Sequence, residues 1–301
     1  MKALIIGCGS IGQRHDEVLR NTGLFTDIDF VSRRQQDGRT AYASLPEVKD
    51  INRYDYFVIA SETSKHYEQL VWLDSNVSGR TIMCEKPLFA DGVLPEIRNN
   101  RVFAGYVLRF HPVVQELRRI LSGKPVISAN VICASYLPQW RKDRDYRTTY
   151  SAKAAEGGGA LLDLSHEIDY SLMLFGGFAE VRGMTAKVSK LETDSEDTVS
   201  IIAKTESGGV VTMNMDYISR IPVRKILAHT DEFTVSADII ENRIEFCGQD
   251  GEDVVTDFII ERNEMFDAMH RDALAGGTLG CTYAEGLEVM KVIRTVQEQS
   301  R

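Results

Sequence analysis

The sequence predicts an α/β domain with a doubly wound parallel sheet over residues 1–120, followed by an α+β domain with an open, mostly antiparallel sheet over residues 121–301. Three observations predict this fold class. An apolar N-terminal run leads into a glycine turn and a helix, and strands and helices then alternate to about residue 107. From about residue 126, strands follow one another through short turns. Alternation is typical of parallel sheets, whereas strands in direct succession form antiparallel hairpins.

The first strand is predicted over residues 2–6, because this run is apolar and feeds a glycine turn at residues 7–12. The turn opens a helix over residues 14–21, which Thr22 and Gly23 end. The same alternation predicts strands at 28–32, 56–60, 81–84 and 102–107, and a helix at 66–73.

In the second half, apolar runs bounded by short turns predict an antiparallel sheet. Its expected strands are 126–135, 180–188, 198–205, 209–217, 225–229, 232–236 and 243–246. Helical segments are expected at 161–175, 261–275 and 283–299, the last of them packing back on the first domain.

Composition excludes several classes of protein. With 301 residues, 43% of them hydrophobic and 26% charged, the chain is not a disordered tail, a fibre or a coiled-coil rod. No apolar run approaches the roughly 18 residues that cross a bilayer, so a cytoplasmic protein without a membrane partner is expected. The five cysteines form no CxxC pair, which argues against a disulfide framework or a zinc site, and no metal site is predicted.

The charge is unevenly divided between the two predicted domains. Residues 1–120 carry 16 Lys plus Arg and 15 Asp plus Glu, whereas residues 121–301 carry 19 and 29. The net charges are therefore +1 and −10, of a total of −9. The acidic second half argues against nucleic acid as a partner, and we expect Arg14, Arg33, Arg34 and Lys86 of the first half to face a phosphate-bearing ligand.

The Gly7-x-Gly9-x-x-Gly12 turn predicts a dinucleotide site on a Rossmann domain, because it directly follows a strand and opens a helix. The first glycine permits the tight turn, the second lets the main chain approach a pyrophosphate, and the third allows close packing of helix and strand. A purely structural glycine turn is the alternative. The residues expected to bind the cofactor here are Gly7, Gly9, Ser10, Ile11 and Gly12.

The end of the second strand favours NADP(H) over NAD(H). An NAD site usually has Asp or Glu there, whereas this chain has Ser32, Arg33 and Arg34. Guanidinium groups match the oxygens of a 2′-phosphate, so these three residues are expected at the adenosine ribose. The alternatives are that the two arginines are solvated loop charges and that the cofactor is NAD(H).

Two further motifs carry chemistry. Glu85-Lys86-Pro87 ends a predicted buried strand, and glycines 157–159 precede Asp163 and His166. On one continuous helix, Asp163, His166 and Asp169 or Tyr170 would share a face.

Together these motifs resemble the Gfo/Idh/MocA family, the relatives of glucose-fructose oxidoreductase and inositol dehydrogenase, over essentially the whole chain. The resemblance implies a Rossmann domain and a sheet domain whose open face forms homodimers or homotetramers. It also implies hydride transfer between a nicotinamide and an alcohol of a sugar, cyclitol or sugar nucleotide.

By position, Lys86 corresponds to the family's catalytic lysine, and Pro87 to the proline, often preceded by a cis bond, that aims it. His166 corresponds to the acid/base histidine and Asp163 to the acid upstream of it. Only Leu164 and Ser165 separate these two, where many relatives have three residues. The chemistry agrees, because histidine titrates near neutral pH, a lysine stabilises developing negative charge on oxygen, and Asp163 could orient the imidazole or hold a substrate hydroxyl. The alternatives are a salt-bridged Lys86, a buried His166 and a capping Asp163.

Other residues are expected around the ligands. Ser61, His66 and Glu85 lie near strand ends where cofactor loops gather. His66 resembles the family's histidine in that loop, but we favour its interpretation as a helix-start residue without a catalytic role. The basic, aromatic segment 140–147 suggests an anionic sugar derivative, or is simply a solvated charge run. The residues expected at the substrate are Arg109, Trp140, Arg147, Asp169 and Tyr170.

The sequence therefore predicts an NAD(P)-dependent oxidoreductase of a sugar-type substrate, with Lys86 and His166 flanking the reacting carbon. A non-catalytic sensor that keeps the dinucleotide site is an alternative from another class. A biliverdin-reductase-like enzyme is a third, and it would not require the segment from the triple glycine to His166.

Overall fold

The computed structural model describes residues 1–301 except 34–39, 91–93, 142, 250, 252 and 301. The chain divides into two compact units. The first unit is Met1–Val107 with Arg262–Leu287, and the second unit is Leu108–Glu261 with Glu288–Arg301. A stretch from late in the chain thus belongs to the first unit.

The first unit is built on a seven-stranded sheet in the order β15-β6-β5-β4-β1-β2-β3. Its strands are β1 (Lys2–Ile6), β2 (Asp27–Val31), β3 (Ala41–Tyr42), β4 (Tyr56–Ile59), β5 (Thr81–Cys84), β6 (Arg101–Ala104) and β15 (Cys281–Thr282). All neighbours pair in parallel except β15, which is antiparallel to β6. The order reverses between β1 and β4, which is the switch point where open α/β sheets bind ligands.

The strands β1 and β4 are almost entirely buried, as expected of a parallel sheet covered on both faces. Helices α1 (Ser10–Asn21), α2 (His66–Asn76) and α6 (Glu264–Ala275) belong to this unit, with the first turn of α7 (Tyr283–Gln299). Short 3₁₀ turns lie at η1 (Leu45–Glu47), η2 (Ile51–Arg53) and η3 (Thr63–Lys65).

The second unit is built on an eight-stranded sheet in the order β14-β13-β12-β11-β7-β10-β9-β8. Its strands are β7 (Ser128–Ala134), β8 (Phe178–Ala186), β9 (Thr198–Thr205), β10 (Val210–Asp216), β11 (Val223–His229), β12 (Phe233–Asp238), β13 (Arg243–Gly248) and β14 (Asp253–Asp257). Among the described strands of this second sheet, only β10 and β7 pair in parallel. The predicted mixed architecture, a parallel sheet followed by a mostly antiparallel one, is confirmed.

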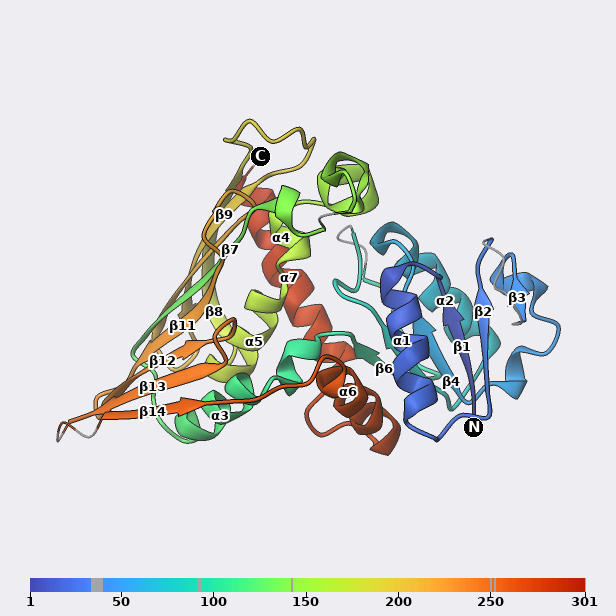
Figure 1. Cartoon of the computed structure of the whole chain (residues 1–301), viewed down its shortest axis with the longest axis horizontal. Helices are drawn as coiled ribbons and strands as arrows, with labels where there is room; N and C mark the ends of the chain where they lie inside the picture. Colours follow the sequence, from blue (N-terminus) through green and yellow to red (C-terminus); the bar gives the residue numbers. More distant parts are fainter. Residues whose placement is uncertain (34–39, 91–93, 142, 250, 252, 301) are drawn as a thin grey trace. The chain divides into compact units, whose positions relative to one another are not determined.

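Helices α3 (Pro112–Leu121), α5 (His166–Phe175) and the later part of α7 cover one face of this sheet (Figure 1). Side chains alternate accordingly: along β9, Val199, Ile201 and Ala203 are buried, whereas Ser200, Ile202 and Lys204 are exposed. The short helix α4 (Ala160–Asp163) and the 3₁₀ turns η4 (Val107–Phe110), η5 (Leu137–Gln139), η6 (Tyr146–Thr148), η7 (Tyr150–Ala152) and η8 (Ala154–Glu156) complete the unit's path.

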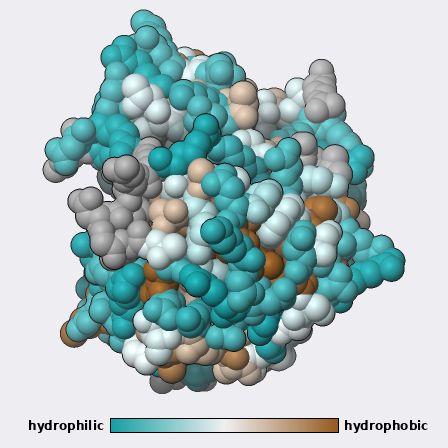
Figure 2. Space-filling model, turned by 90° about the vertical axis from the view of Figure 1, so that its right-hand side faces the viewer, coloured by the Kyte–Doolittle hydropathy of each residue, from teal (hydrophilic) through white to brown (hydrophobic). Residues whose placement is uncertain are grey.

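Among the α-helices and strands of the described residues, four were not predicted from the sequence: β3, α3, β14 and β15. The signal for α3 was present in the sequence, because Pro112 stands at its first position and Val113, Val114, Leu117 and Leu121 form one buried face. Figure 2 shows one face of the molecule, on which hydrophilic residues predominate and hydrophobic ones form separate small groups. Among the described residues, no helix has the length and apolar character needed to span a membrane.

Candidate functional site

The glycine turn after β1 is shaped by three different constraints. Gly7 has a φ of 103°, and a Cβ there would lie 2.5 Å from the carbonyl oxygen of Ala60 at the end of β4. A Cβ on Gly12 would lie 2.2 Å from the carbonyl oxygen of Gly7. Around Gly9, by contrast, a Cβ would meet no described atom within 4 Å. Two glycines therefore close the strand–helix packing, and the third leaves open space.

That open space lies at the N-terminus of α1. Gly9 is the N-cap and supplies no side-chain cap, the first turn contains no acidic residue, and Ser10 is exposed beside half-buried Ile11. The unsatisfied N–H groups and the positive end of the helix dipole favour an anion at such a position. The residues present thus fit the pyrophosphate of a dinucleotide.

The end of β2 presents no carboxylate to a ribose. Of the two acids in this strand, Asp27 at its start is paired with Lys2. Asp29, nearer the carboxyl end, is buried and accepts hydrogen bonds from Arg53 and, at 2.6 Å, from the Tyr54 hydroxyl. Beyond the strand, the Ser32 N–H donates to the Tyr42 carbonyl at 2.8 Å and Arg33 is exposed. Arg34 lies outside the described residues.

The loop after β4 is fixed by His66. The two ring nitrogens of this buried histidine face main-chain carbonyls, Nδ1 at 3.1 Å from Pro87 and Nε2 at 3.3 Å from Ser61. Burial lowers the pKa of His66. The Ser61 hydroxyl donates to Gln69 at 2.7 Å. His66 thus ties the Ser61 loop to the turn after β5, which favours a positioning role over a catalytic one.

The Glu85-Lys86-Pro87 turn follows β5 and therefore lies at the same carboxyl edge of the sheet as the glycine turn. The Lys86–Pro87 peptide is cis, and Lys86 is half-buried. Glu85 accepts a hydrogen bond from the Lys86 N–H at 3.3 Å and contacts His15 at 2.9 Å.

Arg14 does not take the place expected for it. Its guanidinium donates to the Arg262 carbonyl at 2.6 Å and to Asn263 at 3.2 Å, and it lies over the Phe266 ring, 4.6 Å from the centroid. These contacts engage Arg14 with the 262–287 segment of the first unit rather than with a phosphate site.

In the second unit, Asp163 ends α4 and His166 begins α5, so the single continuous helix expected here is wrong. Asp163 is buried and accepts hydrogen bonds from Tyr150 at 2.5 Å, Ser151 at 2.6 Å and Tyr217 at 3.0 Å. Burial raises the pKa of Tyr150 and of Tyr217, so both hydroxyls keep their hydrogens and donate them. His166 is half-buried.

The triple glycine has a packing reason. A Cβ on Gly158 would lie 2.2 Å from the Tyr150 carbonyl oxygen, and one on Gly159 would lie 2.4 Å from Glu196 Oε1. Gly158 therefore lets the η7 segment, which carries Tyr150 and Ser151, approach the start of α4, and Gly159 leaves room there for the Glu196 side chain.

Three of the residues expected at the substrate are interior. Arg109 and Asp169 form a buried ion pair with each other, Nη2 to Oδ1 at 2.8 Å. Tyr170 is fully buried and donates to Glu167, which is paired with Arg224 at 2.7 Å. The pairs connect η4 to α5 and α5 to β11, so their geometry gives them a packing role.

The other two expected substrate residues are exposed. Trp140 is 38% exposed, donates from Nε1 to Ser135 at 2.8 Å, and packs edge-on against Tyr217 with ring centroids 5.2 Å apart. Arg147 is paired with Asp145 at 2.8 Å and with Glu192 at 3.1 Å, so its charge is compensated within the protein.

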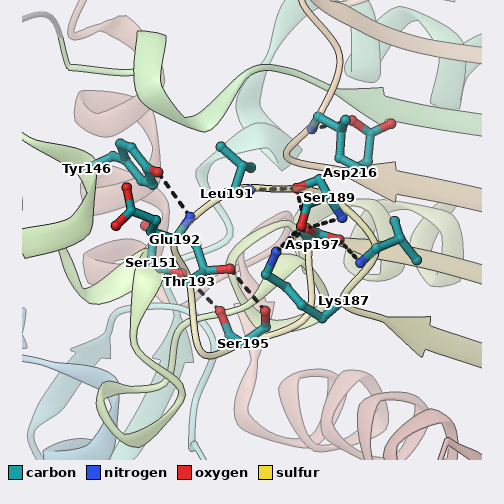
Figure 3. Close-up of polar contacts among 12 residues, drawn as sticks. Tyr146, Ser151, Lys187, Ser189, Leu191, Glu192, Thr193, Ser195, Asp197 and Asp216 are labelled. Atoms are coloured by element: carbon teal, nitrogen blue, oxygen red, sulfur yellow. Dashed lines mark hydrogen bonds and ion pairs between the residues drawn. The ribbon is translucent and has the colours of Figure 1, made fainter.

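The loop of residues 187–197, between β8 and β9, makes polar contacts with the segment that carries Tyr146 and Ser151 (Figure 3). Buried Asp197 accepts from Lys187 at 2.9 Å, from the Val188 N–H at 2.9 Å and from the Ser189 hydroxyl at 2.5 Å. The Ser195 hydroxyl donates to the Ser151 carbonyl at 3.3 Å. This loop thus braces the segment that supplies hydroxyls to Asp163. Among the residues that the structure describes, no group of three or more His, Cys, Asp or Glu is arranged to hold a metal ion.

Two family models match the chain. The model described as "Oxidoreductase family, NAD-binding Rossmann fold" matches residues 1–96, and that of the GFO/IDH/MocA C-terminal domain matches residues 121–252. The chain belongs to the Gfo/Idh/MocA family. It is therefore a member of an NAD-binding oxidoreductase family, and the resemblance seen in the sequence is confirmed.

Curated Gfo/Idh/MocA relatives include trans-1,2-dihydrobenzene-1,2-diol dehydrogenases. The chain is 24% identical to that of Xenopus tropicalis over 198 residues, 63% of this chain and 58% of the relative. It is 25% identical to that of Sus scrofa over 183 residues, 58% of this chain and 52% of the relative. The matches thus span less than two thirds of the length of these relatives.

Solved structures share the Gfo/Idh/MocA fold over the full chain. A levoglucosan dehydrogenase in complex with NADH superposes with a TM-score of 0.85 at 15% identity, covering 100% of this chain and 96% of that chain. A UDP-N-acetylglucosamine 3-dehydrogenase from Acidithiobacillus ferrooxidans has a TM-score of 0.75 at 19% identity, covering 100% and 97%.

Tyr150, Ser151 and Tyr217 are partners of Asp163 that sequence reasoning missed. They converge on Asp163 from η7 and from the end of β10, with Tyr217 54 positions away in sequence. The one sequence signal was the triple glycine, which indicates a close approach of main chain but does not name the partner.

Proposed function

We propose that this chain is an NAD(P)-dependent dehydrogenase or reductase that transfers hydride between a nicotinamide and a secondary alcohol or ketone of a sugar, sugar nucleotide or cyclitol. The observation that carries the proposal is the pairing, at one carboxyl edge of a parallel sheet, of an open glycine turn with Glu85-Lys86-Pro87. The first feature fits a pyrophosphate, and the second supplies a half-buried amine at a strand end.

NADP(H) is the favoured cofactor. Asp29 is engaged with Arg53 and Tyr54, and Asp27 lies at the opposite end of β2, so the carboxyl end of the strand offers no carboxylate for ribose hydroxyls. Exposed Arg33 follows directly and suits a 2′-phosphate. A family described as NAD-binding, with relatives solved in complex with NADH, makes NAD(H) the alternative.

A bound nicotinamide would supply the hydride chemistry, and the protein's own residues would handle the proton and the charge. We assign His166 as the acid/base that takes the hydroxyl proton in oxidation and returns it in reduction. We assign Lys86 as the donor that hydrogen-bonds the substrate oxygen and stabilises its developing negative charge. Lys86 belongs to the first unit and His166 to the second.

Asp163 is proposed to act through Tyr150 rather than as a base. Both of its oxygens accept hydroxyl hydrogens, which leaves the carboxylate engaged within the protein. Tyr150 is half-buried, and its oxygen retains capacity to accept a substrate hydroxyl.

Trp140 remains the best-supported substrate contact, because an exposed ring fixed by Ser135 and Tyr217 offers a rigid apolar surface to a sugar. The compensated charge of Arg147 weakens the case for an anionic substrate and favours a neutral sugar or cyclitol.

We also propose a homodimer or homotetramer formed through the open face of the second unit's sheet. Exposed apolar side chains there include Ile132, Ile202 and Met184 on three different strands. A cytoplasmic location is proposed with it, because all five cysteines are free thiols. Light scattering of the purified chain tests the assembly, and a monomer at micromolar concentration contradicts it.

The test of the function follows the absorbance of the reduced nicotinamide with a panel of neutral sugars, cyclitols and sugar nucleotides. We expect substrate-dependent reduction of NADP⁺, or oxidation of NADPH, with at least one class. Tight NADPH binding without any such change across the panel would instead support a non-catalytic sensor, and turnover of a linear tetrapyrrole would support the biliverdin-reductase-like alternative.

A further inference from the structure

Four polar side chains form a continuous hydrogen-bonded chain inside the first unit. His15 on α1 contacts Glu85 after β5, with Nε2 and Oε1 2.9 Å apart. His15 Nδ1 lies 2.8 Å from Nε2 of His270 on α6. His270 Nδ1 lies 2.7 Å from the hydroxyl of Tyr56 on β4. The chain joins four elements and ends at the residue that precedes Lys86.

The directions of these hydrogen bonds follow from the carboxylate at one end. An ionised carboxylate only accepts, so His15 donates from Nε2, and in a ring with this single hydrogen Nδ1 accepts from His270. His270 then carries its hydrogen on Nε2, and its Nδ1 accepts the hydroxyl hydrogen of Tyr56. In this arrangement the His270 ring is neutral. Burial lowers the pKa of His270, which favours the same neutral form.

The chain is sealed from solvent. His15, His270 and Tyr56 are 0% exposed, and Glu85 is 9% exposed. In this low-dielectric interior each donor polarises the next, which makes the chain more directional than its separate bonds. Because it ends at a fully buried tyrosine, it orients groups rather than conducting protons to solvent.

Glu85 connects these hydrogen bonds to the main chain of the Glu85-Lys86-Pro87 turn. Its Oε1 contacts His15, while Oε2 accepts the Lys86 N–H at 3.3 Å. The carboxylate also requires glycine at residue 105, because a Cβ there would lie 2.9 Å from Oε1. The titratable and charged groups around it are Arg14 and His15 of α1, His66 of α2, Cys84 of β5 and the adjoining Lys86.

We propose that His15, His270 and Tyr56 act as one positioning chain that orients the Glu85 carboxylate and, through it, the main chain at Lys86. The inference rests on the proposed function, in which Lys86 binds the substrate oxygen. In this proposal the 262–287 segment of the first unit contributes His270, which lies between His15 and Tyr56 in the series of hydrogen bonds.

The first test reads the hydrogens directly. In the full chain labelled with ¹⁵N at histidine, NMR at neutral pH should show His15 and His270 as neutral rings with hydrogen on Nε2. A hydrogen on Nδ1 of either ring, or an imidazolium at either site, would contradict the proposed series of hydrogen bonds from Tyr56 to Glu85. Replacing each histidine singly by Gln assigns the signals.

The second test measures hydrogen exchange at the Lys86 amide, which needs no substrate. His15→Leu removes the link and should speed exchange about tenfold, the factor that corresponds to one lost hydrogen bond. His15→Gln keeps an N–H donor toward Glu85 and should restore most of the protection. The kcat should fall and recover in parallel, with cofactor affinity unchanged.

Tyr56→Phe is the decisive variant, because Tyr56 does not touch Glu85 in the described contacts. It should speed exchange at Lys86 by a smaller factor, whereas Tyr54→Phe, an equally buried tyrosine bonded to Asp29, should leave it unchanged. Equal effects of the two variants would overturn the proposal, and this comparison stands even where His15→Leu does not fold. If the wild-type protein is inactive but shows the expected exchange pattern, the proposed enzyme function is refuted and the positioning role of His15, His270 and Tyr56 stands.

Discussion

Arg109 and Asp169 are 60 residues apart in sequence and form a buried ion pair in which Arg109 Nε lies 3.0 Å from both carboxylate oxygens. Their side chains are 3% and 1% exposed. Removing one partner strands a charge in the interior, so Asp169→Asn should lower the free energy of unfolding by about 3–5 kcal/mol. Urea unfolding followed by circular dichroism measures the loss.

A matched control is the exposed Arg147–Asp145 pair. Asp145→Asn should leave the melting temperature nearly unchanged, because solvent screens this pair. A fully stable Asp169→Asn variant with a raised KM would contradict the packing role and return Asp169 to the substrate site.

Substitutions at Gly9 and Gly12 should affect cofactor binding and folding, respectively. Gly9→Ala adds a methyl group where no described atom lies within 4 Å, so the fold should persist while NADPH affinity falls at least about tenfold by crowding of the pyrophosphate. Gly12→Ala meets the Gly7 carbonyl oxygen at 2.2 Å and should destabilise the first unit itself. Fluorescence titration and thermal melts measure the two effects. Unchanged NADPH affinity in Gly9→Ala would place the pyrophosphate elsewhere.

Cofactor preference should follow residues 32 and 33. The Ser32→Asp, Arg33→Ala double variant should lower the ratio of NADPH to NADH affinity by about 10- to 100-fold, since charged hydrogen bonds contribute about 1.5–3 kcal/mol. Arg98→Ala, an exposed arginine of the same unit paired with Glu96, is the control. A constant ratio in the double variant would show that Arg33 is a solvated loop charge.

His111 makes stability pH-dependent. Burial lowers its pKa from 6.5 to about 4 in the folded state. Between these values the unfolded chain binds a proton that the folded chain does not, so stability falls as pH drops, by about 1–3 kcal/mol in total. His111 also caps α3 by accepting the Val113 N–H at 3.2 Å.

His111→Asn keeps a capping side chain and removes the titration. Urea unfolding at neutral and mildly acidic pH should therefore give a flatter dependence in the variant than in the wild type. Parallel pH dependences would show that His111 titrates normally in the folded chain.

The sequence predicted the architecture because local signals specify it. The apolar run of β1 and the glycine turn identified the first unit, and alternation such as that of β9 identified the second sheet. The two-residue strands β3 and β15 carry too few side chains to show a pattern. The break between α4 and α5 also escaped, because no proline marks it and Asp163 turns toward distant hydroxyls instead.

The site was only partly predictable for the same reason. Motif positions such as Gly9 and Lys86 are local, whereas pairing is not. Arg109 and Tyr170 looked available for a ligand until the fold gave them Asp169 and Glu167 as partners. Similarly, Arg14 stands next to the glycine turn in sequence but is engaged with residues almost 250 positions later.

Lys86 is proposed to act on the substrate oxygen without contributing to the affinity for the cofactor. Single-turnover oxidation of NADPH, with a ketone substrate found in the panel, should slow by at least about 10²-fold in Lys86→Ala. The NADPH dissociation constant, measured by fluorescence in the same variant, should stay within a few-fold of the wild type. Single-turnover oxidation at the wild-type rate in Lys86→Ala would exclude this role of Lys86.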